Sequence, residues 1–193
     1  MTGHGPDRAS LSFCEELAGY IDFEETDYEA AFRAGEAAGR RLSVQLRICT
    51  DDVDRFIADA RHVARVTGWV RGDALGGPLE VEDGEFNVVV QPDGGRRMDY
   101  RLRFHDAADR PLTLVGRKDL PLDPDGAAWT LYTRLLAGHV DAAAPVIATG
   151  ILHILPGGFA KQLTTFRVDP PLRLDALARF GALLAGDLWE TYR

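Results

Sequence analysis

Residues 98–105 read Met-Asp-Tyr-Arg-Leu-Arg-Phe-His, and this stretch decides the fold because every second side chain is apolar or aromatic. Successive side chains of a β-strand point to opposite faces of a sheet, so this alternation predicts a strand with one buried face. Similar short segments, separated by Gly, Pro and Asp turns, follow one another from residue 60 to residue 169. This spacing of hairpin after hairpin predicts an antiparallel barrel or sandwich.

The same pattern extends to the N-terminal part of the chain, although Glu15 and Glu16 break the alternation of the first segment. Asp83-Gly84 falls inside one apolar run, where we expect a β-bulge or a tight hairpin. We expect strands over residues 11–23, 41–50, 62–71, 79–90, 98–105, 112–120, 129–137, 146–154 and 159–168.

Helices are predicted at three places. Thr26-Asp-Tyr-Glu29 fits a capping box that opens an Ala-rich helix ending near Gly39, and residues 51–60 fit a short helical connection. After Pro170-Pro171, leucines and Phe180 recur at helical spacing, which predicts an amphipathic helix over residues 172–192. We expect its apolar stripe to pack against the sheet, with a membrane or partner surface as the alternative.

These elements predict a mainly β protein with one folded domain. Residues 1–10 are expected to form a flexible arm, and residues 11–193 an antiparallel, lipocalin-like β-barrel with its C-terminal helix packed on the outside.

Composition excludes several classes of function. The net charge of −8 disfavours binding to nucleic acid or anionic lipid. No stretch approaches the ~20 apolar residues of a membrane span, and the first residues lack a signal pattern, so we expect no membrane insertion and a cytoplasmic location. Cys14 and Cys49 are then expected to be free thiols. The Ala, Gly, Arg and Asp bias is typical of a GC-rich bacterial genome.

Motifs for covalent or cofactor chemistry are absent from the sequence. The only serines, Ser10, Ser12 and Ser43, lie outside any Gly-flanked nucleophile elbow, and no phosphate-binding glycine loop occurs. Four of the five histidines are scattered along the segments that follow residue 60, and a surface or structural role is favoured for each, although strands can bring two of them together. They are His62, His105, His139 and His153. We therefore predict neither a cofactor nor a metal site.

The functional prediction depends on the inner face of the barrel. Alternation turns Tyr100 inward and carries Lys118 toward the interior or its rim. In segment 159–168, the face that holds Phe166 also carries Gln162 and Thr164. We predict Tyr100, Lys118 and Gln162 as catalytic residues, and as substrate-binding residues Trp69, Phe86, Phe104, Tyr132, Thr164 and Phe166. The alternative is an ordinary hydrophobic core without a ligand site, in which the hydroxyls of Tyr100 and Tyr132 reach water and Lys118 extends to the rim of the barrel.

Several segments resemble a β-rich domain of bacterial proteins similar to cholesterol oxidases, where it accompanies flavin-dependent oxidoreductase and α/β-hydrolase modules. The similar segments are residues 75–87, 98–104, 111–118, 130–136, 162–167 and 179–189. The resemblance covers most of residues 11–192 and implies steroid-like or other polycyclic, hydrophobic ligands. It carries no catalytic residue over to this chain.

Together these features predict a protein that binds a hydrophobic polycyclic, polyketide, terpenoid or sterol-like molecule in a barrel cavity. We expect a cofactor-independent cyclase or isomerase, because folding a flexible substrate into a reactive conformer lowers the barrier without a nucleophile. The alternative is a non-catalytic binding or accessory domain that works with a separate oxidoreductase or hydrolase. Association of two copies of the chain into a homodimer also stays open.

Overall fold

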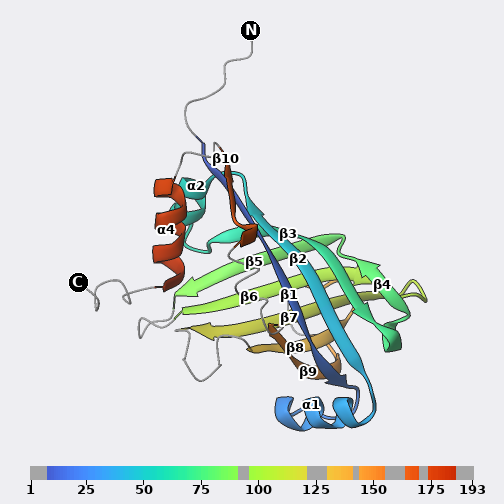
Figure 1. Ribbon diagram of the computed structural model, residues 1–193. Helices are drawn as coiled ribbons and strands as arrows, with labels where there is room; N and C mark the ends of the chain where they lie inside the picture. The colour runs from blue at the N-terminus through green and yellow to red at the C-terminus, as the bar shows by residue number, and fades with distance from the viewer. Residues whose placement is uncertain are drawn as a thin grey trace.

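The structure is a computed structural model that describes residues 8–90, 96–120, 130–140, 144–154, 164–169 and 174–185 (Figure 1). Its elements, in chain order, are β1 (Ser10–Asp22), α1 (Tyr28–Ala37), β2 (Arg41–Thr50), α2 (Val53–Ala58), β3 (Val63–Gly72), a short 3-10 helix η1 (Asp73–Leu75), β4 (Gly77–Glu80), β5 (Asp83–Val90), β6 (Arg96–His105), β7 (Pro111–Leu120), β8 (Thr130–Ala137), β9 (Val146–Ile154), β10 (Arg167–Asp169) and α4 (Leu174–Ala185).

The strands form a closed antiparallel barrel, as the alternation predicts. Its eight strands follow the order β1-β2-β3-β5-β6-β7-β8-β9, and β9 pairs back onto β1. The two halves of β1 have different partners: Leu17 to Asp22 pair with β9, whereas Ser10 to Ser12 pair with β10. The long first strand therefore both closes the barrel and holds the chain segment that precedes the C-terminal helix.

Alternate side chains of the barrel strands point into the interior, most clearly in β2, β6 and β7. In β6 and β7 the inward positions face each other in register, with Leu102 opposite Leu114 and Phe104 opposite Leu112. These four side chains are at most 4% exposed. Tyr100 lies opposite Gly116, where a Cβ atom would collide with the side chain of Leu131. The absence of a side chain at residue 116 therefore leaves room for the neighbouring large residues.

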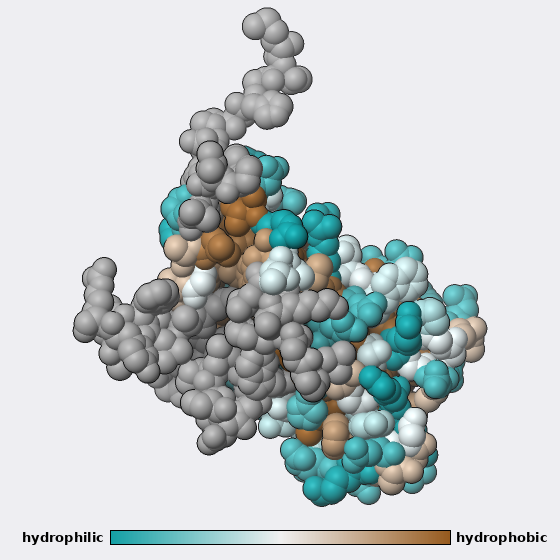
Figure 2. All heavy atoms as spheres, viewed as in Figure 1, coloured by the Kyte–Doolittle hydropathy of each residue, from teal (hydrophilic) through white to brown (hydrophobic). Residues whose placement is uncertain are grey.

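The C-terminal helix α4 packs outside the strands, beside α2 and β10, as predicted (Figure 1). Its Phe180 is 1% exposed and lies against Phe13 of β1, Phe56 of α2 and Phe166, with ring centroids 5.5–6.4 Å apart. These four rings form an aromatic cap at one end of the barrel. Figure 2 shows hydrophobic residues gathered near α4 and β10, while the surface toward β4 is mostly hydrophilic.

The first helix, α1, contacts β1 and β9 at the other end of β1 (Figure 1). Its predicted capping box is shifted by one residue. The side chain of Asp27, not of Thr26, accepts the hydrogen bond from the Ala30 backbone amide at 2.9 Å. A carboxylate at this position also interacts favourably with the positive end of the helix dipole.

Two predicted strands differ from the structure. Segment 79–90 is divided into β4 and β5, which both pair with β3, and Val81 between them donates a backbone hydrogen bond to the carbonyl of Gly68. Segment 159–168 is also not one strand. Thr164 and Thr165 are helical, and β10 begins only at Arg167. Residues 155–163 lie outside the described part of the chain. The local alternation cannot show that β3 changes partners at Gly68.

Among the residues that the structure describes, no helix has the length and apolar character needed to cross a membrane.

Candidate functional site

A carboxylate lies inside the barrel wall, on β1. Glu15 occupies an inward position of this strand, between Phe13 and Leu17, and it is only 5% exposed. A charged group in such surroundings loses most of its hydration, which costs several kcal/mol unless other groups compensate for it. Glu15 therefore requires partners from the opposite side of the barrel.

Two of the predicted catalytic residues provide these partners. The hydroxyl of Tyr100 donates a hydrogen bond to Glu15 Oε2 at 2.7 Å, and Lys118 Nζ lies 2.9 Å from Glu15 Oε1. Tyr100 and Lys118 are each 2% exposed, and Lys118 Nζ also lies 5.2 Å from the centroid of the Tyr100 ring. The three residues form a buried network, named here the Glu15 triad, which joins β1, β6 and β7.

The surroundings of Tyr100 keep its phenol protonated. Burial, followed by the negative charge of Glu15 and the hydrogen bond to it, raises the pKa of Tyr100 well above its ordinary value of 10.0. The phenol therefore stays protonated and acts as a hydrogen-bond donor. The Lys118 ammonium balances the charge of the Glu15 carboxylate, so the network is close to neutral as a whole.

The choice of lysine at residue 118 has a chemical reason. Lys118 is one of only two lysines in a chain that uses arginine for its other basic residues. A guanidinium presents five N–H donors in a fixed plane, whereas an ammonium is compact and has three donors on a flexible stem. An ammonium therefore fits beside a single buried carboxylate and leaves fewer donors to satisfy.

The triad lies next to the aromatic cap. The ring of Phe86 meets the ring of Tyr100 edge to face, with centroids 5.2 Å apart, and also contacts Phe13 at 6.2 Å. Phe166 stacks on Phe13 with a centroid distance of 4.9 Å. The polar groups of Glu15, Tyr100 and Lys118 are thus bordered by aromatic rings. A few polar groups among apolar and aromatic side chains are typical of a small-molecule site.

The other predicted site residues lie in different places. Phe86, Phe104 and Phe166 belong to the core or pack against it, and the ring of Phe86 contacts the ring of Tyr100. Thr164 is exposed. Gln162 lies outside the described residues.

Two predicted substrate-binding residues lie on the outer surface of the barrel. Tyr132 lies between the ring of Tyr28 and the guanidinium of Arg117, at 5.2 and 5.7 Å. Trp69 is 45% exposed and lines an outer hollow of about 280 Å³ between β1, β2 and β3. Neither side chain belongs to the triad, because each occupies the outward phase of its strand.

Glu15 is the site residue that the sequence prediction missed. A glutamate is ordinarily solvent-exposed, so the sequence alone indicates only that Glu15 breaks the alternation of the first strand. The signal that identifies it is its phase: Leu11, Phe13, Glu15 and Leu17 are spaced by two residues, so Glu15 shares the face of three apolar side chains.

Comparisons of the chain with known protein families, with curated proteins and with solved structures give no match.

Proposed function

We propose that the barrel binds a hydrophobic small molecule of the polycyclic, polyketide, terpenoid or sterol-like kind at the Glu15 triad, and that it acts as a cofactor-independent isomerase or cyclase. The observation that carries this proposal is the buried cluster of one acid, one phenol and one ammonium beside aromatic rings. Buried titratable groups that interact with one another are enriched at functional sites.

The triad has the groups that polarise a carbonyl. Glu15 accepts one N–H of the Lys118 ammonium, which carries three, so Lys118 retains donors for a ligand oxygen. The neutral phenol of Tyr100 has one hydrogen, which it donates to Glu15, and it becomes a second donor when it exchanges that hydrogen bond for one to the ligand oxygen. Donors fixed in a site from which water is excluded stabilise the negative charge that develops on a carbonyl oxygen during enolisation.

The carboxylate of Glu15 completes a proton-transfer step. In a β,γ-unsaturated ketone it takes a proton from the α-carbon beside the carbonyl. The carbonyl oxygen, now part of a dienolate, then accepts hydrogen bonds from Lys118 and from Tyr100, whose hydroxyl turns away from Glu15. The carboxylic acid of Glu15 then returns the same proton to the γ-carbon, which shifts the double bond and regenerates the carboxylate. The step needs no cofactor, and all atoms and charges balance.

One observation favours the alternative of a non-catalytic binding or accessory domain that works with a separate oxidoreductase or hydrolase. Both oxygens of Glu15 already accept hydrogen bonds, at 2.7 and 2.9 Å. A carboxylate whose two oxygens both have partners must give up one of these contacts before it can take a proton from a ligand carbon. A site of this kind recognises a ligand carbonyl without removing a proton from it.

Calorimetry and absorbance separate these functions. The probes are a saturated steroid ketone, the corresponding hydrocarbon, an anthraquinone and a β,γ-unsaturated steroid ketone, whose isomerisation produces a conjugated enone that absorbs in the ultraviolet. We expect the ketones to bind and the hydrocarbon to bind more weakly. Tyr100→Phe is expected to weaken ketone binding at least about fivefold, because one hydrogen bond is lost. Tyr132→Phe, the same change on the outer surface, is the matched control.

The isomerase arm uses Glu15→Gln, which keeps the size of the side chain. We expect this variant to bind the ketone and to lose the isomerisation. Binding by the wild-type chain without any conversion would support the accessory domain instead. The proposal as a whole is wrong if no probe binds, or if Tyr100→Phe and Tyr132→Phe bind the ketones equally well.

A further inference from the structure

Three side chains with metal-binding groups meet at another place on the barrel, distant in sequence from one another. Glu82 lies between β4 and β5, His105 is the last residue of β6, and His139 follows β8. The ligand atoms of these residues all lie within 4.8 Å of one another. One carboxylate and two imidazoles are a ligand set that zinc and similar divalent transition metals prefer.

The first two members are already in contact. His105 Nδ1 lies 2.6 Å from Glu82 Oε1, and the ring of His105 meets the ring of His139 with centroids 4.7 Å apart. The backbone amide of Glu82 donates to the carbonyl of Arg103, which anchors this connection to β6. The side chains of Glu82 and His105 are 50% and 34% exposed, so an ion from solution can reach them.

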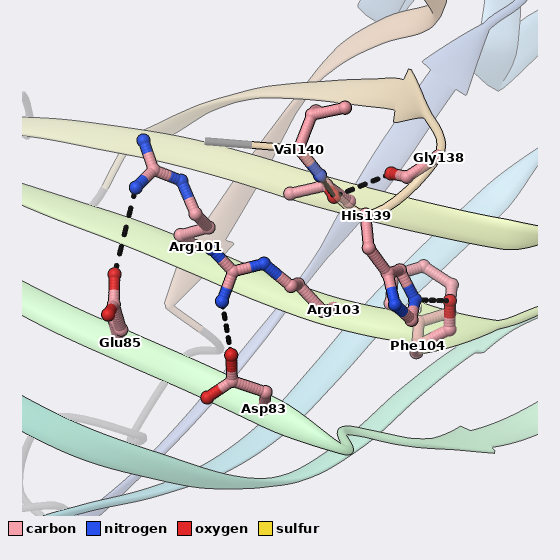
Figure 3. A network of polar contacts seen from close by, with 9 residues as sticks. Asp83, Glu85, Arg101, Arg103, Phe104, Gly138, His139 and Val140 are labelled. Atoms are coloured by element: carbon pink, nitrogen blue, oxygen red, sulfur yellow. Dashed lines mark hydrogen bonds and ion pairs between the residues drawn. The ribbon is translucent and has the colours of Figure 1, made fainter. Parts of the chain in front are cut away.

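The third member is held by a partner outside the cluster. His139 Nε2 lies 3.0 Å from the backbone carbonyl oxygen of Phe104 (Figure 3). A carbonyl oxygen only accepts hydrogen bonds, so Nε2 carries the hydrogen and Nδ1 carries the lone pair. Histidines that bind metals characteristically donate their second ring N–H to a carbonyl or carboxylate, which orients the ring and fixes its tautomer.

The loop that carries His139 is fixed in turn by β7. The hydroxyl of Thr113 donates to the Gly138 carbonyl at 2.7 Å and accepts from the Val140 amide at 3.1 Å, on both sides of the histidine. The Gly138 amide donates to the carbonyl of Pro111 at 2.8 Å. Gly138 has φ of +84°, a conformation that glycine adopts without strain. His139 is therefore positioned by three hydrogen bonds of its own loop.

The charges around the cluster favour a cation. The carboxylate of Glu82 places a negative charge in direct contact with the His105 ring, with Oε1 2.6 Å from Nδ1. Arg103, which lies on the same strand as His105, is paired with Asp83 (Figure 3). Its positive charge is therefore largely balanced.

We propose that Glu82, His105 and His139 form a binding site for one Zn²⁺ ion or a chemically similar divalent transition metal, with water in the fourth position. Bonds of about 2.0–2.1 Å in a tetrahedron place ligand atoms about 3.3 Å apart. The three side chains reach this spacing by small rotations, because two of them are substantially exposed. The ion would join the β4–β5 connection, the end of β6 and the loop after β8.

Titration calorimetry with Zn²⁺ and visible absorption with Co²⁺ on the whole chain test this site. We expect one ion per chain and a Co²⁺ spectrum with nitrogen and oxygen ligands, without the sulfur charge-transfer band that Cys14 or Cys49 would produce. Glu82→Gln and His139→Ala are each expected to weaken binding at least about tenfold. His153→Ala removes a histidine on β9 outside the cluster and serves as the matched control.

Circular dichroism establishes that each variant is folded. Glu82→Gln keeps the size of an exposed side chain, so it tests the site even if a histidine variant fails to fold. The proposal is overturned if Zn²⁺ does not bind, if Glu82→Gln binds as tightly as the wild-type chain, or if His153→Ala weakens binding as much as His139→Ala. A Co²⁺ spectrum with thiolate ligands would also overturn it.

Discussion

At the scale of single residues, the Glu15 triad determines how charge is accommodated inside the barrel. Glu15 and Lys118 are separated by 103 residues in the chain, yet their charged atoms lie 2.9 Å apart and both side chains are buried. A buried ion pair adds little net stability compared with apolar residues of the same size, because both charges lose their hydration. Removing one partner is costly, since it leaves the other charge without compensation.

Lys118→Met is therefore expected to lower the free energy of unfolding by about 3–5 kcal/mol, measured by urea unfolding at neutral pH. The double variant Glu15→Gln/Lys118→Met removes both charges and should recover most of this loss. Arg117→Met is the matched control, because Arg117 is the neighbouring basic residue and its side chain is 50% exposed. A loss below about 1 kcal/mol for Lys118→Met would contradict this prediction, because other groups would then compensate for the buried charge of Glu15.

At the scale of secondary-structure elements, the end of β1 is fixed by a single carboxylate. Asp22 accepts hydrogen bonds from the backbone amides of Glu24 and Glu25 at 2.9 and 3.0 Å, and it pairs with Arg40, the residue before β2. These backbone hydrogen bonds are the main cause that lowers the pKa of Asp22 below its ordinary value of 3.8. The interaction links β1, the start of the turn before α1 and β2.

The lowered pKa predicts a pH dependence of stability with a definite sign. The folded protein binds the Asp22 proton less tightly than the unfolded chain, so the contribution is complete above the ordinary pKa and is lost as pH falls through the folded pKa. Asp22→Asn is therefore expected to be less stable than the wild type at pH 7, and the difference should shrink below about pH 4. Urea unfolding at several pH values measures it. Glu36→Gln changes an exposed residue of α1 and is the control: its difference in stability from the wild type should not depend on pH in this range.

The aromatic cap makes the C-terminal helix part of the folded core. Phe180 of α4 is 1% exposed and contacts rings from β1, α2 and the segment before β10. Phe180→Ala should lower the free energy of unfolding by about 3–5 kcal/mol, because it removes apolar contacts and leaves a cavity. Ala178→Ser, on an exposed position of the same helix, is expected to change it by less than about 0.7 kcal/mol. Equal stability of the two variants would show that α4 is not part of the cooperative unit.

At the scale of the whole molecule, the barrel depends on the contact between its first and last strands. Gly150 of β9 lies opposite Ile21 of β1, and a Cβ atom at Gly150 would collide with the backbone of Tyr20 and Ile21. The two strands approach this closely only because residue 150 has no side chain.

Gly150→Ala is accordingly expected to separate β1 from β9 and to lower the free energy of unfolding by about 1–3 kcal/mol or more. Faster hydrogen exchange at the amides of Leu17 to Asp22 would locate the effect at this pair of strands. Gly181→Ala provides the contrast: a Cβ atom there meets no atom within 4 Å, and alanine favours the helix by about 1 kcal/mol. Unchanged stability of Gly150→Ala would contradict this account of barrel closure.

The local sequence determined the kind of fold and the orientation of many side chains. Alternation in β6 and β7 places Tyr100 and Lys118 on the inner face, and both are buried in the structure. The apolar repeat after residue 172 predicted α4 in the same way. These features are predictable because the two-residue period of a strand and the 3.6-residue period of a helix follow from local backbone geometry.

Only the tertiary structure decided which side chains meet. Glu15 and Tyr100 are 85 residues apart, and their hydrogen bond depends on the curvature of the closed barrel as well as on its strand register. His105 and His139 come together because their strands end at the same side of the barrel and Thr113 holds the loop between β8 and β9. The division of segment 79–90 into β4 and β5 likewise follows from their common pairing with β3. Strand pairing and barrel closure join distant parts of the chain, so no local pattern carries this information.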